Sequence, residues 1–139
     1  MVTHEQQTEK TALIVEDDKA VLQLIRLYLA QAGYRILEAQ DGVAGLRMAL
    51  EESPDIVLLD LNLPDARGED VVRAIRTQMH LDTPIVVLSG EIVVDTVISL
   101  KPFNVSGFVA KSTDFEARLI EEVDKVFGTA GEISDDLPI

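Results

Sequence analysis

Residues 55–60 read Asp-Ile-Val-Leu-Leu-Asp and are the starting point for predicting the fold. Its apolar residues Ile56 to Leu59 form a continuous run, which is typical of a strand that is covered on both faces in a parallel sheet. A loop with Pro64 and Gly68 follows, and a helical pattern then runs from about Glu69 to Gln78. The stretch therefore predicts a buried parallel strand followed by a helix.

The same alternation of strand and helix continues on both sides of this stretch. Further strands are predicted at residues 11–16, 34–39, 85–88 and 107–110. The first helix is predicted from an N-cap at Asp18 to Gly33, the second over 43–52, and the last from a capping box at 113–116 to near Gly128. Such alternation implies right-handed crossovers. We expect an α/β fold in which a doubly wound, five-stranded parallel sheet forms the middle of a three-layer sandwich.

Length and composition set the domain organisation. A chain of 139 residues has room for one core, so we expect a polar, disordered leader at 1–9, one folded domain at 10–128, and an acidic tail or start of a linker at 129–139. The apolar runs are too short to cross a bilayer, the leader has no apolar signal segment, and cysteine is absent. These features favour a soluble, cytoplasmic protein without membrane contact.

Charge limits the partners. The formal net charge of -13 would repel phosphate backbones, so direct nucleic-acid binding is not expected. His4 and His80 stand apart from other ligand-type residues and are interpreted as ordinary surface residues.

Polar residues occur where the predicted strands end. Because the carboxyl ends of parallel strands meet at one edge of the sheet, we expect these side chains to lie together. Each alone has an ordinary interpretation as a cap, a loop residue or a solvated lysine. The set consists of Glu16, Asp17, Asp60, Ser89 and Lys111.

Converging carboxylates need a counter-charge, since each pair repels by roughly 4 kcal/mol at ~4 Å and an effective dielectric constant of ~20. Oxygen ligands without nearby histidine or cysteine suit Mg²⁺, which is the predicted cofactor. A carboxylate such as Asp60 beside that cation could attack a phosphorus atom, with Lys111 and the Ser89 hydroxyl contacting the transferring oxygens.

These residues resemble the receiver domains of two-component response regulators over about Lys10 to Gly128. The resemblance rests on residues 14–18, 60–64 with Gly68, 89–91 and 107–111. Their intervals are typical of the family: 43 residues from Asp17 to Asp60, 29 from Asp60 to Ser89, and 22 from Ser89 to Lys111. The resemblance implies the flavodoxin-like strand order 2-1-3-4-5.

The resemblance also implies a role for each site residue. Asp60 would be the phosphoacceptor, Asp17 a direct metal ligand and Glu16 a partner that acts mainly through water. Asn62 would bind the metal through its backbone carbonyl, and Ser89 would sense the phosphoryl group. Phe108 would swing inward as the switch aromatic, although core packing is its simpler interpretation, and Glu91 would modulate dephosphorylation.

Two segments depart from the family pattern. Lys111 precedes Ser112 where proline is usual, so we do not expect a cis peptide bond there. Lys101-Pro102-Phe103 imitates the missing motif, but it lies too soon after Ser89, and Pro102 would interrupt a helix.

The helix between Ser89 and Gly107 is expected to be short, mobile or docked on a partner, because β-branched residues dominate residues 92–98. Core packing explains some of these residues. The others would lie exposed on the face formed by helix 4, strand 5 and helix 5, through which receivers pass on their signal.

Three functions follow from these patterns. The leading hypothesis is a receiver, itself not an enzyme in the usual sense, which takes phosphate from a sensor histidine kinase or a phosphotransfer protein and changes its affinity for an unknown output partner. A homodimer is left open. One alternative is a phosphohydrolase of the haloacid dehalogenase type, although that family has a second Asp where Asn62 stands. The other alternative is a receiver-like interaction module that takes no phosphate.

Overall fold

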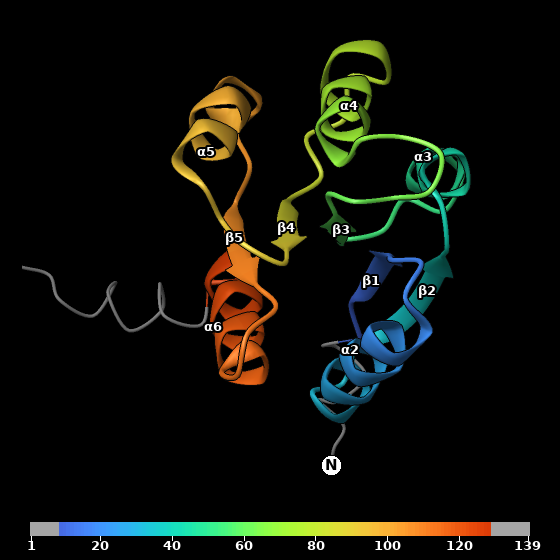
Figure 1. The fold of residues 1–139 in the computed structure, drawn as a ribbon. Helices are drawn as coiled ribbons and strands as arrows, with labels where there is room; N and C mark the ends of the chain where they lie inside the picture. Colours follow the sequence, from blue (N-terminus) through green and yellow to red (C-terminus); the bar gives the residue numbers. More distant parts are fainter. Residues whose placement is uncertain (1–8, 129–139) are drawn as a thin grey trace, which may run out of the picture.

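The computed structural model describes residues 9–128, and the predictions for the rest of the leader, including His4, and for the tail lie outside that range. Five strands form one sheet in the order β2-β1-β3-β4-β5, and every neighbouring pair is parallel. This confirms the predicted three-layer α/β sandwich and its strand order (Figure 1).

The strands are short and almost completely buried in the middle of the sheet. Their bounds are β1 Thr11–Val15, β2 Arg35–Ala39, β3 Ile56–Asp60, β4 Ile85–Ser89 and β5 Gly107–Ala110. All residues of β3 and β4 are buried, as the continuous apolar runs predict. Because β1 and β3 are paired side by side, the residues that follow or end them come out at the same edge of the sheet.

One face of the sheet is covered by α2, Lys19–Gln31, and α6, Phe115–Val126 (Figure 1). The Asp18 carboxylate accepts hydrogen bonds from the backbone N–H groups of Ala20 and Val21, which confirms the predicted N-cap of α2. Every second strand residue points into this layer and packs against Leu22, Ile25, Leu29, Leu119 and Val123.

The capping box predicted for the last helix is wrong. Asp114, not Thr113, precedes α6, and the Asp114 side chain makes no capping hydrogen bond to the first turn of the helix. The Asp114 carboxylate instead accepts a hydrogen bond of 2.7 Å from the Ser112 hydroxyl, so the side chain faces the preceding loop.

The other face of the sheet is covered by three helical segments (Figure 1). They are α3, Gly42–Glu51; α4, Gly68–Arg73, which continues as a π-helical turn over Ala74–Gln78; and α5, Val94–Leu100. The predicted helix at 69–78 is therefore present, but its second half is wound more loosely than an α-helix.

The segment after β4 forms only a short helix, as its β-branched residues predict. α5 spans seven residues and continues as a single 3₁₀ turn over Lys101–Phe103, where Pro102 ends the α-helical pattern. Val94 and Ile98 are exposed, whereas Leu100 is buried against the sheet. All peptide bonds between the described residues are trans, including Lys111–Ser112.

Among the helices of residues 9–128, none combines the length and the apolar character that crossing a membrane requires.

Candidate functional site

The acidic pair after β1 places one carboxylate inside the protein and one at its surface. Glu16 is fully buried, and Asp17 is exposed. The Glu16 backbone N–H donates to the carbonyl of Ala39 at 3.0 Å, and its Oε2 accepts from the Asp18 N–H at 3.1 Å. These bonds keep the Glu16 side chain at the edge of the sheet.

Asp60 ends the central strand β3 and is only 2% exposed. Its Oδ1 accepts a hydrogen bond from the backbone N–H of Asn62 at 3.2 Å, so the carboxylate and the following loop are joined. Asn62 itself is exposed at the mouth of the site. Because β3 pairs with β1, Asp60 lies beside the acidic pair, as the parallel sheet predicts.

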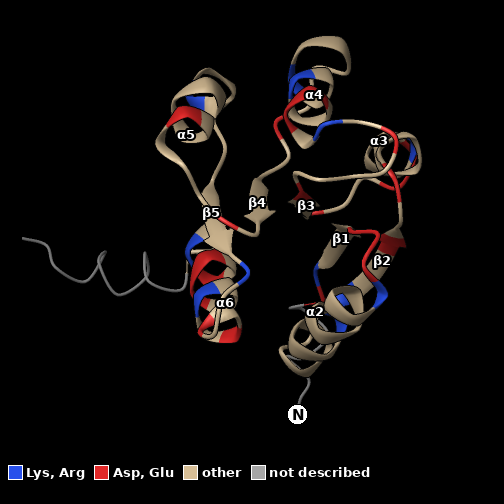
Figure 2. Cartoon of the chain, in the orientation of Figure 1, with Lys and Arg blue, Asp and Glu red and all other residues tan. Residues whose placement is uncertain are grey.

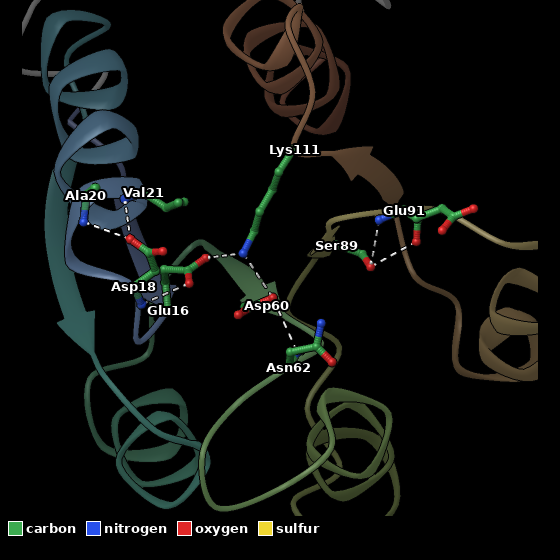
Figure 3. Close-up of polar contacts among 9 residues, drawn as sticks. All are labelled: Glu16, Asp18, Ala20, Val21, Asp60, Asn62, Ser89, Glu91 and Lys111. Carbon is green, nitrogen blue, oxygen red and sulfur yellow. Dashed lines mark hydrogen bonds and ion pairs between the residues drawn. The ribbon is translucent and has the colours of Figure 1, made fainter.

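Lys111 comes from the end of β5 and reaches across to both buried carboxylates (Figure 3). Its Nζ lies 2.8 Å from Oε1 of Glu16 and 3.1 Å from Oδ1 of Asp60. Burial lowers the pKa of Lys111, but the close contact with Glu16 and the negative charges of Glu16 and Asp60 outweigh burial and raise that pKa. Lys111 is therefore a firmly charged counter-ion.

Glu16 experiences opposing influences. Burial raises the pKa of Glu16, and the charge of Asp60 adds to that effect, while Lys111 and the Asp18 N–H lower it; the net direction is upward. The approach of Lys111 to Oε1 is an ion pair rather than a well-aligned hydrogen bond, so within the described residues this buried oxygen has no hydrogen-bond donor. The site therefore holds more carboxylate charge than its one lysine satisfies.

The donor atoms fit a hard divalent cation. One oxygen each from Glu16, Asp17 and Asp60 lies within 4.8 Å of the others, and the set contains oxygen donors only. Mg²⁺ prefers such ligands and retains waters at its remaining positions. The exposed Asp17 and the buried Asp60 open onto the loop edge of the sheet, where Figure 2 shows acidic residues after β1 and at the end of β3. The residues present thus suit the predicted magnesium.

Ser89 ends β4 beside Asp60, yet its hydroxyl faces away from the carboxylates. It donates to the backbone carbonyl of Glu91 at 2.9 Å (Figure 3). Glu91 is exposed in the loop between β4 and α5. The backbone of Lys111 donates to the carbonyl of Ser89 at 2.8 Å, which ties the two strand ends together.

Phe108 lies on β5, three residues before Lys111, and is half-buried. Its ring packs against the core beneath α3, α4 and α5. It also lines a surface cavity of about 350 Å³, together with Ile92 and Ala110. The residue thus combines core packing with a position next to open space.

The structure also reveals two polar residues that the sequence did not single out. Asp65 in the loop after β3 binds backbone N–H groups of α3, and Arg76 binds four backbone carbonyls near the starts of β4 and β5. No sequence pattern names their partners, which lie up to 28 residues away. For Asp65, the sequence offers only its position directly after Leu63-Pro64 in a predicted loop, which does not indicate which helix it caps.

Comparison with known proteins identifies relatives along most of the chain. Residues 12–124 match the family model of the response regulator receiver domain. The transcriptional regulatory protein KdpE of Mycobacterium tuberculosis is 40% identical over 78 residues, which cover 56% of this chain and 34% of KdpE. The cell cycle transcriptional regulator CtrA of Caulobacter vibrioides is 35% identical over 109 residues, which cover 71% of this chain and 47% of CtrA. The chain spans less than half the length of these relatives.

Solved structures show the same fold. The chemotaxis response regulator CheY4 of Vibrio cholerae superposes with a TM-score of 0.78 at 28% identity, covering 86% of this chain and 99% of CheY4. The signal receiver domain of a LuxO repressor protein from Vibrio parahaemolyticus has a TM-score of 0.79 at 24% identity, covering 94% and 99% of the two chains. The likeness to the latter concerns the fold alone. On the family match, the chain belongs to the response regulator receiver domains.

Proposed function

We propose that this receiver accepts a phosphoryl group on Asp60 in a Mg²⁺-dependent reaction. The observation that carries the proposal is the cluster at the edge of the sheet. There the buried Asp60 carboxylate lies within ion-pair distance of Lys111 and within 4.8 Å of donor oxygens from Glu16 and Asp17. A nucleophile, a cation site and a fixed ammonium are the parts that phosphoryl transfer to a carboxylate requires.

In the proposed reaction an oxygen of Asp60 forms a bond to the phosphorus of the donor while the bond from phosphorus to the leaving group breaks. The leaving group keeps the electron pair and takes a proton. Mg²⁺, held by Asp17, Asp60 and the Asn62 carbonyl and by Glu16 mainly through water, would neutralise charge on the transferring oxygens. The Nζ of Lys111 contacts Oδ1 of Asp60, so it lies close to the position of the incoming phosphoryl group. Lys111 would turn from the carboxylates to a phosphoryl oxygen.

The change at the site would reach the surface through Ser89 and Phe108. Rotation of the Ser89 hydroxyl toward the phosphoryl group would break its bond to the Glu91 carbonyl and release the loop that leads into α5. Phe108 lines the neighbouring cavity together with Ile92 of that loop, so it could turn inward as the loop moves. The face formed by the fourth and fifth helices, labelled α5 and α6 in the structure, and by β5 exposes Val94 and Ile98. This face would then alter its affinity for an output partner. Glu91 would tune the lifetime of the phosphorylated form.

The phosphodonor we propose is the phosphohistidine of a sensor kinase or a phosphotransfer protein in the cytoplasm. The receiver itself would occupy residues 10–128. It would catalyse its own phosphorylation and dephosphorylation without acting on an outside substrate. Its net charge of -13 gives no basis for direct contact with nucleic acid.

Incubation of the wild-type protein and Asp60→Asn with acetyl phosphate, with and without Mg²⁺, tests the proposal. We expect labelling of about one phosphoryl group per wild-type chain, only with Mg²⁺ and sensitive to hydroxylamine as an acyl phosphate is. Asp60→Asn should take up none. Steady turnover of added phosphate esters would indicate a phosphohydrolase, and absence of any label would indicate an interaction module that takes no phosphate.

A further inference from the structure

Asp65 lies in the loop between β3 and α4, and its side chain caps a different helix. Its Oδ1 accepts a hydrogen bond from the backbone N–H of Gly42 at 2.7 Å, and its Oδ2 accepts one from Val43 at 3.0 Å. Gly42 and Val43 begin α3, where backbone N–H groups have no partner within the helix. One carboxylate thus joins two segments that are more than 20 residues apart in the chain.

The contact between this loop and α3 is tightly packed. A Cβ atom added to Gly42 would lie 3.1 Å from the Cβ of Ala66 and 3.2 Å from Oδ1 of Asp65. The bare backbone of Gly42 therefore allows the loop to approach closely enough for both hydrogen bonds.

The base of the same loop carries the site residues. The Asn62 N–H donates to Oδ1 of Asp60 at 3.2 Å, and the Gly68 N–H donates to the carbonyl of Leu61 at 2.8 Å. The loop is thus closed at its base beside Asp60 and held at its tip by Asp65. Asn62 lies between these two attachments.

The N-terminus of α3 is in turn fixed to the acidic pair. The Glu16 N–H donates to the carbonyl of Ala39, just before α3 begins. A Cβ on Gly45 of α3 would lie 2.9 Å from a methyl carbon of Val15, the residue before Glu16. The hydrogen bonds of Asp65 therefore connect the loop after β3 with the segment that holds the end of β1.

We propose that Asp65 is a positioning residue for the metal site: by fastening the loop to α3, it fixes the distance between the Asn62 carbonyl and the carboxylates of Glu16 and Asp17. This inference rests on the proposed function, because it assumes that the cluster binds Mg²⁺. A loop freed from α3 would leave one ligand undefined and would weaken binding, as loss of supporting hydrogen bonds does at other metal sites.

Asp41 offers a matched control. Its side chain caps the same helix through the Ala44 N–H at 2.8 Å, but it belongs to the segment of α3 and makes no bond to the loop. Asp65→Ala and Asp41→Ala each remove one negative charge and the side-chain hydrogen bonding at the same helix end. Only Asp65→Ala cuts the link to the metal loop.

Isothermal titration with Mg²⁺ on the full unphosphorylated chain, together with thermal melting, tests the inference. We expect the Kd for Mg²⁺ to rise by up to about tenfold in Asp65→Ala and to change little in Asp41→Ala, although both variants melt earlier than the wild type. Equal values of Kd in the two variants would overturn the inference while leaving the proposed function intact. If the wild-type protein itself binds no Mg²⁺, the proposed function fails and this inference fails with it.

Discussion

The ammonium of Lys111 lies 2.8 Å from Oε1 of Glu16, a carboxylate with no exposed surface. The two residues are far apart in the sequence. They follow β1 and β5, which are not neighbours in the sheet. Lys111 also contacts Asp60, so a single cation balances two buried anions. The positive charge of Lys111 offsets part of the repulsion between the two buried carboxylates.

Lys111→Met should destabilise the protein by about 3 kcal/mol in metal-free buffer, because it leaves Glu16 and Asp60 buried without their counter-ion. Excess Mg²⁺ should reduce that deficit by supplying the missing positive charge. Chemical denaturation with and without Mg²⁺ measures both effects. Lys125→Met is the control: the exposed Lys125 forms an ion pair with the partly buried Glu122, so its loss should cost less than about 1 kcal/mol and show no dependence on Mg²⁺. An equal deficit of Lys111→Met at all Mg²⁺ concentrations would contradict the account.

Mg²⁺ should raise the melting temperature of the wild-type protein, since ligand binding to the folded state stabilises it. In metal-free buffer Asp60→Asn should melt later than the wild type, because it removes repulsion between Asp60 and Glu16, and Mg²⁺ should stabilise this variant less. Asp55→Asn provides the control at the other end of β3, where Asp55 accepts a hydrogen bond from the Thr11 N–H. This variant should respond to Mg²⁺ as the wild type does. Identical responses of Asp60→Asn and Asp55→Asn would argue against a cation at Asp60.

Ionisation of Tyr34 should lower the free energy of unfolding at high pH. Burial, with a smaller effect of the charge of Asp124, raises the pKa of Tyr34 to about 12. Because this folded-state pKa exceeds the ordinary value of about 10, the contribution of Tyr34 is complete below pH ~10 and is lost as the pH rises toward ~12. Denaturation of the wild type and Tyr34→Phe between these pH values measures the effect. The variant should lose less stability over this range, and parallel curves would contradict the assignment.

Arg76 should stabilise the two loops that lead into β4 and β5. Its guanidinium donates to the carbonyls of Leu81, Thr83, Phe103 and Asn104 at 2.7–3.3 Å. Arg76→Met should therefore cost about 2 kcal/mol of unfolding free energy. Arg73→Met removes a neighbouring arginine whose ion pair with Asp70 is exposed, and it should cost less than about 1 kcal/mol. Equal costs in denaturant titrations would show that the four carbonyls find water as readily as Arg76.

Gly68 should tolerate no side chain. A Cβ there would lie 2.5 Å from the Cα of Leu61 and 2.8 Å from the carbonyl oxygen of Asp60, both backbone atoms. Gly68→Ala should therefore cost about 2 kcal/mol and distort the loop after β3. Gly90→Ala is the control, because among residues 9–128 only its chain neighbours could lie within 4 Å of the added Cβ. Thermal melting of the two variants compares their losses of stability. Equally small changes in melting temperature would show that the loop after β3 shifts to accommodate a Cβ at Gly68.

The sequence predicted the strands well because their signals are local. A continuous apolar run such as Ile56 to Leu59 must be buried on both faces wherever it lies, and the structure buries all of it. The β-branched residues after Ser89 likewise predicted a short helix, and α5 spans only seven residues. The capping box at Thr113 failed because spacing alone does not fix the residue at which a helix begins, and α6 begins after Asp114.

Local patterns in the chain were enough to predict the alternation of strands and helices, and with it the edge of the sheet where Glu16, Asp17, Asp60 and Lys111 meet. The packed structure was needed to show that Glu16 is the carboxylate buried against Lys111, that the Ser89 hydroxyl faces Glu91, and that Asp65 caps α3. Apolar runs and helical periodicity involve residues that are close in the chain, so they can be seen in the sequence. A hydrogen bond or ion pair between distant residues requires that both groups be placed to within a few tenths of an ångström, which happens only when all the layers are packed.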